Sequence, residues 1–259
     1  MTTYVERATA GLIEAITPPL SALSFLTVLP VPSVAQTRDG VFGRAIAYFP
    51  LVGTLLGGLV AGSDAACSLL LPRPVVTALD LVVFALLTGG LHLDGLLDSC
   101  DGLLGGRDRE RRLAIMRDSR VGSFGALGGA LILLLEFAAL ATLTGAARAE
   151  ALVLAPTLAR WAMALDVWAF PYARAEGQGT AFKAGLGRRH VVMATAWAGL
   201  VAAGLAPGAP WLLPATGLLA LALGRWIHGR LGGLTGDSYG AVSELVTAAT
   251  FVAFSGRWP

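Results

Sequence analysis

Three aspartates and a histidine stand close together directly after an apolar run of the sequence: His92, Asp94, Asp98 and Asp101. In a helix the aspartates occupy positions i, i+4 and i+7, so their side chains project from one face. Like charges at this spacing repel each other, and a divalent cation is the simplest partner that would hold them together. Because Mg²⁺ prefers carboxylate oxygens, the three aspartates are predicted metal ligands and catalytic residues.

The alternatives at this segment are less specific. The aspartates would be stable as a solvated helix end at a membrane surface, because acidic residues near a helix N-terminus are favoured there. His92 lies two residues before Asp94 and therefore off the shared face. It is either a catalytic residue or an interfacial histidine without a ligand role.

A second group of charged residues is Arg117-Asp118-Ser119-Arg120. Two arginines that flank an acid could bind a phosphate, while Asp118 takes a metal, accepts a proton or orients one arginine. Arg117 and Arg120 are therefore predicted substrate-binding residues, and Asp118 is a predicted catalytic residue. The alternative is that these arginines anchor the next apolar helix on the cytoplasmic side of a membrane.

A third group begins at Thr235 and contains Asp237 and Glu244, which are again seven residues apart. A helix starting here would present both carboxylates on one face, and both are predicted to bind substrate. Asp237 could instead be a simple helix N-cap. Glu244 lies about a turn inside an apolar stretch, where a carboxylate needs a partner. The polar loop that contains Arg174 could close over a large ligand, but a plain connector is the favoured interpretation.

The composition indicates an integral membrane protein. Of the 259 residues, 55% are apolar and 14% are charged, whereas soluble domains carry about 25% charged residues. The long apolar runs predict one all-α domain over residues 1–259, a polytopic bundle of about seven transmembrane segments in the lipid bilayer. The formal charge of +2 gives no indication of a nucleic-acid partner.

The expected spans are separated by polar loops of unequal charge. An interfacial or re-entrant element is expected at the N-terminus, because prolines interrupt the apolar stretch from Ala10 to Pro32. The predicted spans cover residues 45–71, 75–93, 121–146, 151–166, 191–205, 212–227 and 241–254. Alternating them places the three large, arginine-rich loops on one side, which the positive-inside rule makes cytoplasmic. The acidic segment then faces the cytoplasm.

Several of these segments, in the same order along nearly the whole chain, resemble the cobalamin synthase family, whose members are adenosylcobinamide-GDP ribazoletransferases. The matching segments are Leu23–Thr27 with Leu29–Pro32, Phe49–Gly53, His92–Gly102, Ile115–Arg120 and Gly236–Glu244. The resemblance implies a magnesium-dependent enzyme of the bacterial inner membrane. It would join adenosylcobinamide-GDP to α-ribazole, or to its 5′-phosphate, and release GMP.

Two other functions fit parts of the pattern. A membrane enzyme of the CDP-alcohol phosphotransferase kind also uses clustered aspartates and Mg²⁺, although its glycine and aspartate spacing does not fit here. An ion transporter would use Asp64, Asp80, Glu136 and Glu244 as an intramembrane pathway. Most acidic residues of the chain gather at one face instead, which favours the transferase.

Overall fold

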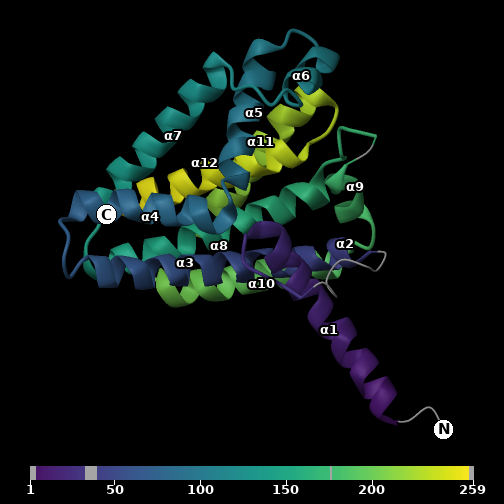
Figure 1. Cartoon of the computed structure of the whole chain (residues 1–259), viewed down its shortest axis with the longest axis horizontal. Coiled ribbons are helices and arrows are strands. Elements are labelled where there is room, and N and C mark those ends of the chain that lie inside the picture. Colours follow the sequence, from purple (N-terminus) through teal and green to yellow (C-terminus); the bar gives the residue numbers. More distant parts are fainter. Residues whose placement is uncertain (1–3, 33–39, 176, 257–259) are drawn as a thin grey trace.

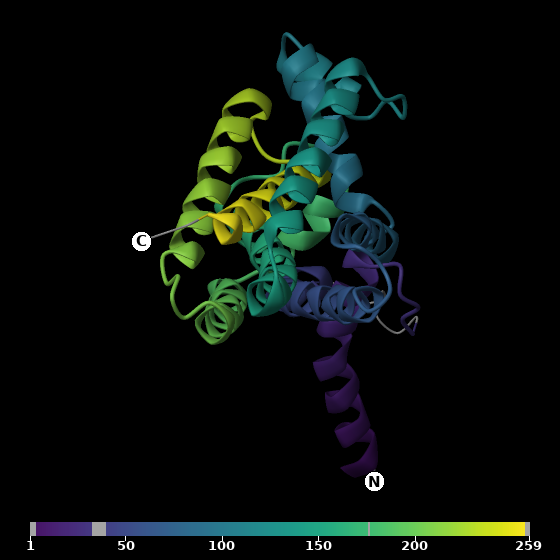
Figure 2. The same ribbon diagram turned by 90° about the vertical axis from the view of Figure 1, so that its left-hand side faces the viewer.

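The computed structural model describes residues 4–32, 40–175 and 177–256, which form an all-α bundle (Figures 1 and 2). The all-α class predicted from the sequence is confirmed. The helices are α1 (Tyr4–Leu26), α2 (Val41–Ala45), η2 (Ile46–Tyr48), α3 (Phe49–Cys67), α4 (Arg73–Thr88), α5 (Leu91–Gly105), α6 (Arg109–Ile115), α7 (Ser123–Thr142), α8 (Gly145–Ala169), α9 (Gln178–Lys183), α10 (Arg188–Leu205), α11 (Leu212–Leu231) and α12 (Gly236–Ser255).

Helix α8 forms the centre of the bundle. It is buried along most of its length and packs against α3, α10, α11 and α12. Small residues allow the closest of these approaches: the backbone of α3 at Gly53 and Gly57 lies directly against α8 at Pro156 and Leu152. A side chain at either glycine would collide with that backbone, so the two helices can pack this tightly only with glycine there.

Three helical segments in the described part of the chain are long and apolar enough to cross a membrane: Val41–Cys67, Ser123–Thr142 and Gly145–Ala169. The pair α4 and α5 would supply a fourth if it counts as one broken span. The other spans predicted near the C-terminus do correspond to helices α10, α11 and α12, but these do not meet the same criteria. The structure therefore supports a membrane protein with several apolar helices.

The predicted span 75–93 is not one straight helix. Helix α4 ends at Thr88, and α5 leaves it at an angle of 91°. Gly89 and Gly90 form the corner with φ values of 61° and 71°, a left-handed conformation that residues with a side chain rarely adopt. As a result, α5 stands almost at right angles to α4 instead of continuing it (Figure 1). The acidic segment occupies this separate helix.

Helix α1 is continuous from Tyr4 to Leu26, although it contains Pro18 and Pro19. Its N-terminal half extends away from the bundle, and its C-terminal half packs against α2 and α3 (Figures 1 and 2). The apolar part, Ile13–Leu26, is too short to be counted as a span. The interfacial or re-entrant placement expected for this segment stays a prediction.

Candidate active site on helix α5

The three aspartates of α5 form a stripe along one side of this helix, as their spacing predicts. Asp94 is exposed, while Asp98 and Asp101 are half-buried. Asp98 interacts electrostatically with Asp94 and Asp101, and also with Asp237 and Arg174 from outside the helix. Neither Asp94 nor Asp98 accepts a hydrogen bond from a residue that the structure describes. Their carboxylates therefore remain available for a ligand.

The start of α12 lies directly against α5. A β-carbon at Gly95 would stand 2.7 Å from the carbonyl oxygen of Asp237, and one at Gly240 would stand 3.0 Å from that of His92. Thr235 caps α12, since its hydroxyl accepts a hydrogen bond from the Ser238 amide at 3.1 Å. Asp237 is thus not the N-cap, and its carboxylate is directed to the acidic stripe and its surroundings.

Arg174 is the site residue that the sequence missed. Its Nη2 donates to Oδ2 of Asp237 at 2.7 Å, and both side chains are mostly buried. The loop that carries Arg174 is held in place by a parallel bridge between Tyr172 and Leu234. The amide of Ala173 donates to the Leu234 carbonyl at 2.8 Å, next to the start of α12. The expected plain connector therefore brings a cation to the acidic stripe.

Asp101 has a structural partner at the other end of the stripe. Its two carboxylate oxygens accept hydrogen bonds from the backbone amides of Gly122 at 2.7 Å and Gly125 at 2.8 Å. These amides belong to the start of α7, where the first backbone N–H groups have no partner within the helix. Asp101 therefore caps α7 from a distance. Its predicted role as a metal ligand would have to be shared with this function.

Asp118 orients Arg120, one of the roles predicted for it. The Arg120 guanidinium donates to both carboxylate oxygens, at 3.0 Å from Nε and 2.7 Å from Nη2. These hydrogen bonds lower the pKa of Asp118 to about 2. Both residues line an open polar cleft between the end of α5, α6 and the start of α7, which Asp101 and Arg111 also line. Arg117 is exposed and is not among the residues that line this cleft.

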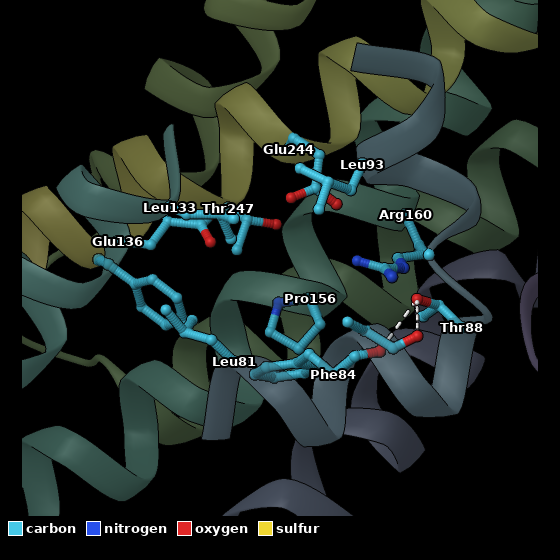
Figure 3. A pocket seen from close by; sticks show the side chains of 13 residues that line it. Leu81, Phe84, Thr88, Leu93, Leu133, Glu136, Pro156, Arg160, Glu244 and Thr247 are labelled. Atoms are coloured by element: carbon cyan, nitrogen blue, oxygen red, sulfur yellow. Dashed lines mark hydrogen bonds between the residues drawn. The ribbon is translucent and has the colours of Figure 1, made fainter. Parts of the chain in front are cut away.

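His92 and Glu244 do not lie on the acidic stripe. His92 is buried with 1% of its surface exposed, and its Nδ1 lies 3.3 Å from Nη2 of Arg160 on α8. Glu244 and Arg160 reach into an internal cavity that Glu136 also lines (Figure 3). Arg160 interacts electrostatically with both glutamates and compensates part of their charge. The sequence predicted that Glu244 needs a partner, and Arg160 supplies it.

Two further acids of the apolar helices, Asp64 and Asp80, are paired with one arginine. Arg148 binds Asp64 through Nε at 2.6 Å and Asp80 through Nη2 at 2.5 Å, and its Nη1 donates to the Leu140 carbonyl at 2.6 Å. This buried cluster joins α3, α4, α7 and α8. An ion pathway would need carboxylates that a passing ion can reach, and Asp64 and Asp80 are occupied by the guanidinium. The arrangement gives no support to the transporter alternative.

The carboxylate oxygens of the stripe could supply some, but not all, of the ligands of a hard divalent cation such as Mg²⁺. Within residues 4–32, 40–175 and 177–256, no three His, Cys, Asp or Glu side chains are positioned to hold a metal ion together. Asp94 and Asp98 nevertheless supply oxygen donors that are not bound to any residue the structure describes. Mg²⁺ commonly binds to one or two carboxylates and completes its shell with water and substrate phosphates. Such a shared mode fits these residues, whereas a site made by protein ligands alone does not.

Comparison with known proteins identifies the family. The sequence profile of the Cobalamin-5-phosphate synthase family matches residues 18–255. The chain belongs to this family. It is 42% identical to the adenosylcobinamide-GDP ribazoletransferase of Geotalea daltonii over 92% of this chain and 97% of the relative. It is 44% identical to the protein of the same name in Pseudomonas paraeruginosa, over 93% and 99% of the two chains.

The match to the Cobalamin-5-phosphate synthase family confirms the resemblance seen in the sequence motifs. Every predicted site residue, from His92 to Glu244, lies within the matched range. Arg174, which only the structure brings to the site, lies within it as well. No solved structure matches the chain.

Proposed function

We propose that this chain is an adenosylcobinamide-GDP ribazoletransferase of cobalamin biosynthesis. It joins adenosylcobinamide-GDP to α-ribazole, or to α-ribazole 5′-phosphate, and releases GMP. A hydroxyl oxygen of the ribazole forms a bond to the phosphate on the cobinamide arm, the bond from this phosphate to GMP breaks, and the hydroxyl proton is released to the solvent. The observation that carries the proposal is the family match over residues 18–255, with relatives of this name covered almost completely.

The stripe on α5 is suited to receive a diphosphate. Asp94 and Asp98 present two carboxylates that make no hydrogen bond or ion pair within the described part of the chain, and Arg174 neutralises the neighbouring Asp237. A bound Mg²⁺ would neutralise charge on the diphosphate and stabilise the departing GMP. The carboxylates of the stripe would orient that ion, because Mg²⁺ requires oxygen ligands in near-octahedral geometry.

The arginines beyond the stripe would bind the nucleotide end. Arg120 is held by Asp118 in a cleft that Asp101 also lines, and the exposed Arg117 directly precedes Asp118 in the chain. Guanidinium groups bind phosphate oxygens with paired hydrogen bonds, so these two side chains suit the phosphates of the guanylyl group. Asp118 keeps its negative charge at neutral pH because of its low pKa. We therefore assign it to positioning Arg120.

We further propose a multi-pass protein of the bacterial inner membrane with the α5 site facing the cytoplasm. The relatives with this name are bacterial proteins. The α5–α7 connection carries the arginines 107, 109, 111, 112, 117 and 120, and positive loops remain cytoplasmic. In addition to the apolar helices, α10, α11 and α12 would then cross or enter the bilayer as part of the bundle, giving about seven segments.

The proposal is tested with purified protein in detergent, given adenosylcobinamide-GDP, α-ribazole and Mg²⁺. We expect GMP release that stops when a chelator removes the divalent cation and returns when Mg²⁺ is added back. Omitting α-ribazole controls for simple hydrolysis of the diphosphate. The absence of GMP release from well-folded protein would refute the transferase assignment, and release that the chelator leaves unchanged would refute the role of Mg²⁺.

A further inference from the structure

A pocket lined by aromatic residues lies beside the start of α5. Its lining residues come from α1, α2, α5 and α9: Ser21, Ser24, Phe25, Phe42, Leu91, Ala181 and Phe182. The residues from α1 are spaced i, i+3 and i+4, so one face of that helix forms a wall. The cavity measures about 290 Å³, at the lower end of the range of roughly 300–1,000 Å³ for small-molecule sites.

The phenylalanines of this region form a connected cluster. The ring of Phe182 meets that of Phe25 edge-on, with centroids 4.7 Å apart and an angle of 74°. It meets Phe42 and Phe49 in the same way, at 5.9 Å and 5.8 Å. Phe182 and Phe49 are buried, whereas Phe25 and Phe42 are half-buried and present surface to the cavity. Such a pocket offers ring surfaces for stacking with a planar ligand.

Two elements connect this pocket with the acidic stripe: helix α5 and the loop that leads into α9. Leu91 lines the pocket and lies three residues before Asp94, so the two side chains are neighbours on α5. The loop that places Arg174 beside Asp237 leads directly into α9, which supplies Phe182. A ligand with its ring in the pocket would therefore extend its other end toward Asp94.

We propose that this pocket binds the planar base of the nucleoside acceptor, the benzimidazole ring of α-ribazole. The proposal rests on the transferase function and names the place of one of its two substrates. Guanine fits less well, because its edge carries several hydrogen-bond donors and acceptors that would lose water on burial. The polar side chains that line the cavity are the two serines, and Ser21 already donates to the Thr17 carbonyl at 2.8 Å.

The experiment compares two substitutions that each add a large ring to a different cavity. Ser24→Trp fills the aromatic pocket. Ala196→Trp fills an exposed groove on α10 that Trp168 and Val192 also line, far from α5 in sequence, and serves as the matched control. For each protein we would measure the KM for α-ribazole and for adenosylcobinamide-GDP separately, together with kcat and the melting temperature.

We expect Ser24→Trp to raise the KM for α-ribazole roughly tenfold or more, the effect of losing a stacked base, and to leave the KM for adenosylcobinamide-GDP unchanged. Phe42→Ala should raise the same KM by removing a ring surface without blocking the cavity. Ala196→Trp should change neither constant. An unchanged KM for α-ribazole in active Ser24→Trp protein, or a rise confined to adenosylcobinamide-GDP, would overturn the proposal.

A direct binding measurement separates this inference from the proposed function. Saturation-transfer NMR with free benzimidazole and with guanosine needs no turnover. Binding of benzimidazole to the wild-type protein, its loss in Ser24→Trp and its retention in Ala196→Trp would support the pocket even if no GMP were released. Stronger binding of guanosine, or benzimidazole binding that Ser24→Trp leaves intact, would refute the pocket even in a fully active transferase.

Discussion

Replacing Gly95 by alanine tests whether the close approach of α5 and α12 assembles the acidic stripe. The new β-carbon would stand 2.7 Å from the carbonyl oxygen of Asp237 and 3.1 Å from its Cα. Ordinary van der Waals contact begins at 3.4 Å, so the helices would have to separate by about 0.7 Å at this point. Both atoms belong to backbone, which cannot rotate away as a flexible side chain can.

The expected change in stability of the Gly95→Ala protein is the sum of two opposing effects. Alanine in a helix interior gains about 1 kcal/mol over glycine, whereas overpacking a tight contact costs about 1–3 kcal/mol. The Gly95→Ala protein should therefore be less stable than a glycine-to-alanine variant without the contact by about 1–3 kcal/mol. Movement of Asp237 away from Asp94 and Asp98 should also reduce transferase activity by a factor on the order of 10 to 100, since small misplacements of positioning groups are costly.

Gly58→Ala on α3 is the matched control, because Gly58 is an exposed helical glycine and a β-carbon there would have no neighbouring atom within 4 Å. Thermal melting in detergent and GMP release would be measured for both variants. Gly58→Ala should melt at or above the wild-type temperature and remain fully active. Wild-type activity in Gly95→Ala, together with a melting temperature as high as that of Gly58→Ala, would refute the view that this contact sets the geometry of the stripe.

Three further substitutions test the other groups. Asp98→Asn should abolish GMP release yet melt no lower than wild type, because it removes repulsion from Asp94; a destabilised protein would contradict this. In Asp101→Asn one backbone amide at the start of α7 loses its acceptor. Thermal melting should therefore show a loss of stability of about 0.5–2 kcal/mol, the usual cost of removing a helix cap. Arg148→Gln should destabilise by about 3–5 kcal/mol, because it leaves buried acids unpaired, and unchanged melting would argue against the buried cluster.

The sequence was most informative where the structure depends on local periodicity. The spacing of Asp94, Asp98 and Asp101 already defined one helical face, and α5 has that face. Long apolar runs likewise predicted the helices α3, α7 and α8. The corner before α5 was missed because hydrophobicity continues through Gly89 and Gly90. Two successive glycines were the available signal, since both positions require positive φ.

Long-range pairing could not be predicted from the pattern. Arg174 and Asp237 are 63 residues apart, and nothing in their immediate neighbourhoods indicates that a loop and a helix start will meet. The same holds for His92, whose partner Arg160 belongs to a different helix. Its position two residues before Asp94 had already placed it off the shared face, and the structure turns it toward α8.

From the distribution of compensating charge along α5 we infer that Asp94 and Asp98 form the reactive part of the stripe. At one end Arg174 pairs with Asp237, and at the other end the α7 amides bind Asp101. Within the described residues, no hydrogen bond or ion pair is made to the side chain of Asp94 or Asp98. An anionic diphosphate placed there would meet two further negative charges, an arrangement that is favourable only with a cation between them. We therefore infer that substrate and Mg²⁺ bind together, and that Asp94 and Asp98, more than Asp101, contact the ion.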